Sequence, residues 1–91
     1  MTELQRGIEQ KSVVERLRIE FPDTAIRVIP TPGVREIWYG VTTNGINFAD
    51  FETELDQSFS ANIRTEKLIR SITAWMDDIN RFIEIYAGVN N

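Results

Sequence analysis

The sequence predicts an α+β fold of two layers, with an N-terminal helix, a three-stranded antiparallel meander and a long C-terminal amphipathic helix (α-β-β-β-α). Three observations predict it. Residues 2–21 are rich in helix-forming Glu, Gln, Arg and Leu, residues 25–48 hold β-branched and aromatic runs separated by turn residues, and residues 62–87 repeat apolar side chains with helical spacing. With 91 residues and no repeat or linker, we expect one domain over residues 1–91.

The first helix is expected to run from an N-cap at Thr2 to Phe21, because Pro22 ends it. Projected at 100° per residue, its apolar side chains form two stripes. One stripe holds Val13, Val14, Leu17 and Phe21, and the other holds Leu4, Ile8 and Ile19. The second stripe exceeds what a single core requires.

Two strands are expected at residues 25–29 and 36–43, both rich in β-branched and aromatic residues. Between them lies Pro-Thr-Pro-Gly at residues 30–33, which predicts a stiff hairpin loop. Alternation along the second strand places Tyr39 on the core face with its apolar neighbours and Trp38 on the opposite face.

A third strand is expected to start at Ile46, because Asn44-Gly45 is a strong signal for a type I′ hairpin turn. The segment 50–59 fits two descriptions. Its apolar residues are spaced four apart, as on a helix, but they also alternate with acids, as on a strand. We favour a strand and leave a short helix open.

The C-terminal helix is expected over residues 62–87, capped by Ser60 or Asn62 and followed by Gly88 as its C′ residue. Its apolar side chains fall within an arc of roughly 140°. The arc comprises Leu68, Ile69, Ile72, Trp75, Met76, Ile79, Phe82, Ile83 and Tyr86. This pattern predicts the main core helix.

Composition removes several kinds of chemistry. The chain has no Cys and no His, which excludes disulfides, thiolate nucleophiles, Cys-based zinc and iron–sulfur sites, and the usual general base near pH 7. No phosphate-binding loop or nucleophile-elbow motif is found. We therefore predict a protein that is not an enzyme and needs no cofactor.

Charge and hydropathy bear on location and partners. Fourteen Asp and Glu against ten Lys and Arg give a formal net charge of -4, which argues against binding to nucleic acid or anionic membranes. The first eleven residues are charged where a signal peptide would be apolar, and no run approaches the ~18 apolar residues of a membrane span. The expectation is a cytoplasmic protein that does not contact membranes.

Four acids at alternate positions, Asp50, Glu52, Glu54 and Asp56, form the densest carboxylate group. On a strand they would share one face, and such a row offers oxygen ligands to Ca²⁺ or Mg²⁺. The spacing of a calcium-binding loop is absent. We favour a solvated strand face that discourages edge pairing, and keep a carboxylate-dependent metal protein or enzyme as an alternative.

Arg64, Lys67 and Arg70 follow one another at three-residue spacing near the start of the C-terminal helix. They offer a second alternative, a nucleic-acid-binding domain, and the element order is also that of a double-stranded-RNA-binding domain. A shared order of helices and strands is weak evidence of function. The net charge of this chain is also negative, whereas a nucleic-acid-binding domain is expected to be positive. We favour a solvated helix flank or a protein contact.

The apolar side chains that a single core does not require give the leading functional hypothesis. Trp38, Tyr39, Ile8 and Ile19 are the candidate contact residues, because exposed apolar and aromatic side chains mark binding surfaces. The hypothesis is a small, acidic, non-enzymatic interaction module that binds another protein or itself. An inhibitor, adaptor or chaperone-like protein, including one of a mobile element, would suit this description.

Overall fold

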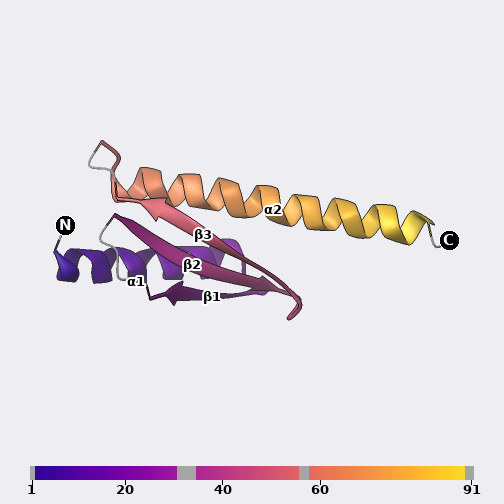
Figure 1. Ribbon diagram of the computed structural model, residues 1–91, viewed down its shortest axis with the longest axis horizontal. Helices are drawn as coiled ribbons and strands as arrows, with labels where there is room; N and C mark the ends of the chain where they lie inside the picture. Colours follow the sequence, from indigo (N-terminus) through magenta and orange to yellow (C-terminus); the bar gives the residue numbers. More distant parts are fainter. Residues whose placement is uncertain (1, 31–34, 56–57, 90–91) are drawn as a thin grey trace.

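The computed structural model describes residues 2–30, 35–55 and 58–89, and its element order confirms the predicted fold (Figure 1). The elements are α1 (Glu3–Glu20), β1 (Thr24–Ile29), β2 (Glu36–Thr43), β3 (Asn47–Glu54) and α2 (Ala61–Val89). The strands form one antiparallel sheet in the order β1-β2-β3, as in a meander. Most of the predicted loop at residues 30–33 lies outside the described residues.

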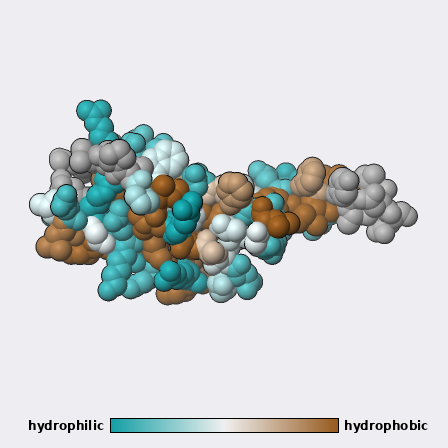
Figure 2. All heavy atoms as spheres, turned by 60° about the horizontal axis from the view of Figure 1, so that its bottom comes forward, coloured by the Kyte–Doolittle hydropathy of each residue, from teal (hydrophilic) through white to brown (hydrophobic). Residues whose placement is uncertain are grey.

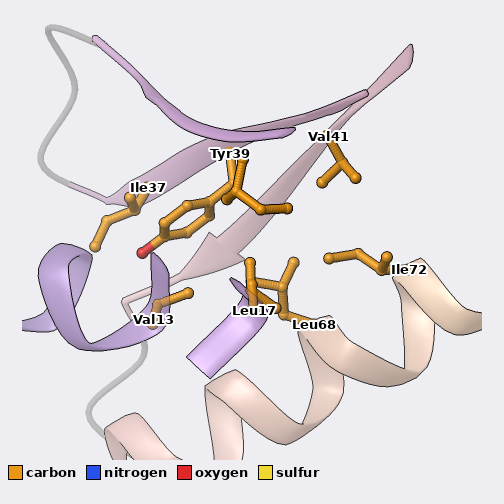
Figure 3. Close-up of a cluster of buried hydrophobic side chains, with 8 residues drawn as sticks. Val13, Leu17, Ile37, Tyr39, Val41, Leu68 and Ile72 are labelled. Carbon is orange, nitrogen blue, oxygen red and sulfur yellow. The ribbon is translucent and has the colours of Figure 1, made fainter. Parts of the chain in front are cut away.

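Both helices pack on the same face of the sheet and bury one hydrophobic core (Figure 3). The helices contribute Val13 and Leu17 from α1 and Leu68 and Ile72 from α2. The strands contribute Ile26, Ile37, Tyr39 and Val41. Among the residues that the structure describes, no helix lies on the opposite face of the sheet, which gives the two layers that the sequence predicts.

The start of α1 follows the predicted capping. The Thr2 hydroxyl accepts a hydrogen bond from the Gln5 backbone N–H at 3.1 Å, and the Gln5 side chain accepts one from the Thr2 N–H at 2.9 Å. This reciprocal pair satisfies two backbone donors that a helix start would otherwise leave unpaired. The exposed first turns of α1 therefore have a local source of stability.

The β2–β3 hairpin turns at Asn44-Gly45, as predicted. Both residues have positive φ, 56° and 71°, which a type I′ turn requires at its two central positions. Ile46 lies between the turn and β3, which begins one residue later than expected. The turn sets the register in which Val41 faces Ala49 and Tyr39 faces Phe51.

We expect Gly45→Ala to lower the free energy of unfolding by about 1 kcal/mol, because a Cβ is strained at positive φ. Space is not the cause, since nothing lies within 4 Å of the added atom. Gly7→Ala is the matched control: it also meets nothing within 4 Å, but in α1 it should raise stability by roughly 0.5–1 kcal/mol. Urea denaturation measures the free energy of unfolding of both variants. If the two substitutions changed it in the same direction, this account of the turn would be contradicted.

Within the ambiguous segment 50–59, residues 50–54 belong to a strand, which confirms the favoured description for that half of the segment. Asp56 and Gln57 lie outside the described residues. Ser60 caps the next helix, because its hydroxyl accepts the Ile63 backbone N–H at 3.2 Å. The helix accordingly begins at Ala61.

Two predictions about α2 are wrong. The helix continues through Val89, so Gly88 is not its C′ residue. The apolar arc is also not core along its whole length: Ile72 is fully buried, but Phe82 is 66% exposed and Ile83 49% exposed. The predicted arc member Tyr86 has a side chain outside the described part of the structure.

The length of α2 explains why its apolar arc is not buried throughout. A helix of 29 residues is about 43 Å long, whereas strands of eight residues span only about 27 Å. The C-terminal half of α2 therefore projects past the sheet and gives the molecule its elongated dimensions of 54 × 24 × 23 Å (Figure 1).

Candidate functional site

Trp38, the first predicted contact residue, lies on the open face of the sheet, opposite the helices. It is half-buried rather than exposed, and its cross-strand neighbours on that face are Ile29 on β1 and Glu52 on β3. A half-buried aromatic with one acidic neighbour presents only a small apolar area. The structure thus places Trp38 on the expected face but does not surround it with an apolar patch.

A row of charged residues separates Trp38 from a further large apolar side chain of this face, Phe48, which is 77% exposed. In that row Arg27 and Asp50 flank Gly40. A Cβ at Gly40 would lie 3.0 Å from Arg27 Nε and 3.6 Å from Asp50 Oδ1, so both side chains reach over the glycine. The open face therefore carries both charged and apolar side chains.

The second stripe of α1 is exposed as predicted, with Ile8 at 60%, Ile19 at 76% and Leu4 at 74%. Helical spacing, however, places Lys11 and Glu15 on the same side between Ile8 and Ile19, and both are exposed. Charges interrupt the stripe, so Ile8 and Ile19 do not form one continuous apolar surface.

Tyr39 cannot serve as a contact residue in this structure, which corrects its assignment to the partner surface. Its side chain is fully buried between the helices and the sheet, and its hydroxyl points toward α1 (Figure 3). Burial raises the pKa of the phenol above its ordinary value, and the negative charge of Glu9 raises it further. The hydroxyl has no hydrogen-bond partner among the described residues.

We expect Tyr39→Phe to raise the free energy of unfolding at pH 7 by about 1 kcal/mol, since it removes a buried hydroxyl that is desolvated without a hydrogen bond. The wild type should also lose stability above pH ~10, where the unfolded chain deprotonates its tyrosine and the folded chain does not. The Tyr39→Phe variant should lose less stability than the wild type over the same pH range. Urea unfolding at pH 7, 9.5 and 11 tests both statements, and a destabilised variant at pH 7 would contradict the first.

Arg64 is not an exposed phosphate ligand, which corrects its place in the predicted basic row. Its guanidinium forms a bidentate ion pair with Glu9, with Nε 3.2 Å from Oε2 and Nη2 bonded to Oε1. The side chains are only 9% and 6% exposed. A further N–H donates to the Phe59 carbonyl. The pair joins α1 to the first turn of α2 inside the core.

The other two members of the basic row do not restore a nucleic-acid surface. Lys67 lies over the Phe59 ring, with Nζ 3.7 Å from the ring centroid, and Arg70 is exposed. With Arg64 buried and paired, the three cations do not form one exposed row. The structure brings Arg64 together with Glu9, and not with Lys67 and Arg70.

Carboxylates on β3 do not converge either. Asp50, Glu52 and Glu54 are exposed and alternate on the open face, about 7 Å apart along the strand, while Asp56 lies outside the described residues. In the part of the chain that the structure describes, no three acidic side chains gather closely enough to hold a metal ion. This arrangement fits a solvated strand face.

A further exposed apolar surface lies on the projecting half of α2, where the sequence periodicity predicts core. Ile79 is half-buried, Phe82 and Ile83 are exposed, and both lie within about 60° of Ile79 on the helix; we call these three residues the overhang stripe. Ile85, 61% exposed, lies about 120° from Ile79, beyond Asp78, and is not part of the stripe. Figure 2 shows hydrophobic surface, in brown, on the narrow projecting part of the molecule.

Most charged residues lie away from the overhang stripe. Asp77, Arg81 and Glu84 are each about 140–160° from Ile79 on the helical projection, whereas Asp78, one turn before Phe82 and about 40° from it, borders the stripe. Phe82 and Ile83 leave roughly 200 Å² of apolar side chain in water, judged from exposed fractions of 66% and 49% and side-chain areas on the order of 150–200 Å². We treat this apolar patch at the end of a projecting helix as a candidate interaction surface.

No protein-family model, curated protein or solved structure matches this chain. Within the described ranges, neither helix combines the length and the apolar character that crossing a membrane requires.

Proposed function

We propose that this chain is a non-enzymatic protein-interaction module and that its contact surface is the overhang stripe of α2. The observation that carries this proposal is the continuation of the core-forming face of α2 beyond the sheet, where Phe82 and Ile83 remain exposed. Burying the exposed parts of these side chains against a partner would contribute about 1–2 kcal/mol each. An apolar stripe on a projecting helix suits a groove or a second helix.

Two features support the non-enzymatic part of the proposal. The chain has neither His nor Cys, and the carboxylates of β3 point to solvent at separations that do not favour shared acid–base work. The polar pair that is buried, Glu9 and Arg64, joins the two helices and is closed off from solvent. These residues hold the fold together at the N-terminal end of α2, about 25 Å along the helix from the surface that we propose for binding.

Photo-cross-linking in cells tests the proposal. A photoreactive phenylalanine analogue replaces Phe82, and the matched control places it at Ile19, which is equally helical and 76% exposed but lies on the interrupted stripe of α1. We expect protein adducts from position 82 at a yield several-fold above position 19. Equal yields, or no adduct from position 82, would refute the overhang stripe as the contact surface.

A further inference from the structure

We infer that the occupant of the overhang stripe is a second copy of this chain, with the two projecting halves of α2 packed antiparallel about a two-fold axis. This inference rests on the proposed function, because it names the partner of the same surface. Three observations carry it: the spacing of the apolar residues, the place where the sheet ends, and the position of the charges.

The apolar residues of α2 follow the spacing of a helix pair. Leu68, Ile72, Trp75, Ile79 and Phe82 are separated alternately by four and three residues. This 3.5-residue period keeps one seam facing another helix along a left-handed pair. The first part of the seam packs on the chain's own sheet, and the second part continues beyond it, so a second helix would extend an interface that already exists.

The sheet fixes the orientation of that second helix. Paired helices lie 8–10 Å apart, whereas the body of the molecule measures about 24 × 23 Å across. If two copies ran parallel, both sheets would have to fit between the helices, because each sheet covers the seam as far as Met76. In the antiparallel arrangement the two bodies lie at opposite ends, and the helices overlap over residues 77–89, about 20 Å.

The distribution of charge favours pairing of the overhang stripe with the same stripe of a second copy. It disfavours packing of the stripe against the open sheet face of a second copy. Asp78 borders the overhang stripe at its edge, where its carboxylate can stay in water, and the stripe itself is apolar, so two stripes meet without burying an unpaired ion. The open sheet face holds Arg27, Asp50 and Glu52, whose desolvation would oppose an apolar helix. A helix-on-sheet contact would also be heterologous and generate open chains, whereas two identical stripes close a dimer.

The available area predicts a weak dimer. The exposed apolar side chains of two copies supply roughly 400 Å², and the flanks of the helices add to this, which places the contact well below the 1,200–2,000 Å² of standard interfaces. We therefore expect a dissociation constant on the order of 10⁻⁴ M. The dimer should form at high protein concentration and dissociate on dilution.

Sedimentation equilibrium of the full chain between 10 µM and 1 mM tests the pairing. The average mass should rise with concentration from 10.5 kDa toward twice that value. Ile83→Glu should weaken association at least tenfold, while the matched control Ile19→Glu should change it less than twofold, although Ile19 is the more exposed of the two. Circular dichroism establishes that both variants fold. A wild-type mass of 10.5 kDa at 1 mM, or equal effects of the two variants, would overturn the inference.

Spin-label distances test the orientation. Because the chain has no Cys, Ser71→Cys and Glu84→Cys each provide a single labelling site on the exposed side of α2. In an antiparallel pair the two labels at position 71 should be separated by about 30–40 Å along the helix axis, and those at position 84 by less than about 10 Å. Equal separations at both positions would indicate parallel helices and overturn the arrangement.

The photo-cross-linking experiment separates the two proposals. Adducts of twice the chain mass from position 82 support the self-pairing. Adducts only to a different protein overturn the second copy as occupant and leave the contact surface in place. Absence of any adduct refutes the contact surface itself.

Discussion

Replacing Arg64 by Met is expected to lower the free energy of unfolding by about 3–5 kcal/mol, because it leaves the buried carboxylate of Glu9 without its partner. For a domain of 91 residues this corresponds to a fall in Tm of at least about 12 °C. Thermal and urea unfolding at pH 7 measure both quantities. The effect should be much larger than that of any exposed charge.

Two controls distinguish a buried pair from a general effect of charge. The double variant Glu9→Leu/Arg64→Met should recover most of the lost stability, since apolar residues can replace a buried ion pair once both charges are gone. Arg16→Met removes the exposed pairs with Glu20 and Glu66 and should cause a far smaller change. If Arg64→Met and Arg16→Met cost the same, the burial of the Arg64 pair would be contradicted.

Ile72→Ala is expected to lower the free energy of unfolding by about 2–5 kcal/mol, whereas Ile83→Ala should change it by less than about 0.5 kcal/mol. Both are isoleucines on the same apolar arc of α2, but Ile72 is fully buried and Ile83 is 49% exposed. Urea unfolding at about 5 µM measures the folded monomer. At this concentration the proposed dimer is dissociated, so a stability loss from Ile83→Ala cannot come from lost pairing.

Equal losses at the two positions would mean that the arc is core along its whole length, as its periodicity alone suggests. A loss of stability from the Ile72 substitution alone would show that only the part of α2 that packs on the sheet belongs to the core. The pair of variants therefore separates the part of α2 that builds the fold from the part that is available to a partner.

Much of the fold could be predicted because its signals are local. The Thr2 cap, the Asn44-Gly45 turn and the alternation around Tyr39 each depend on residues close in sequence, and all are found in the structure. These local signals also fix the strand order, since short connections leave neighbouring strands adjacent and antiparallel.

The end of the core could not be predicted from periodicity, because the arc continues without change past Ile72 to Ile83. The signal that would have found the overhang is length: the expected helix is longer than any expected strand. Comparing the two lengths would have assigned Phe82 to the surface. The contact surface then moves from Trp38 and the α1 stripe to α2.

The buried ion pair was missed for a different reason. Arg64 is expected from the sequence on a solvated helix flank and Glu9 is not singled out, yet each lies four residues before a core position, Leu68 and Val13 respectively. That spacing places them on the buried faces of their helices. A charged residue in an apolar stripe on each of two helices is the pattern that would have predicted their pairing.

Concentration-dependent ¹H–¹⁵N NMR spectra test most directly where this protein makes its contacts. Between 20 µM and 1 mM, we expect amide shifts to change over residues 77–89 and to stay constant in β1, β2 and the first half of α1. Changes centred on Ile8 and Ile19, or on Trp38, would place the contact on the surfaces first expected from the sequence. Those outcomes, or a spectrum that does not change with concentration, would contradict pairing through the projecting half of α2.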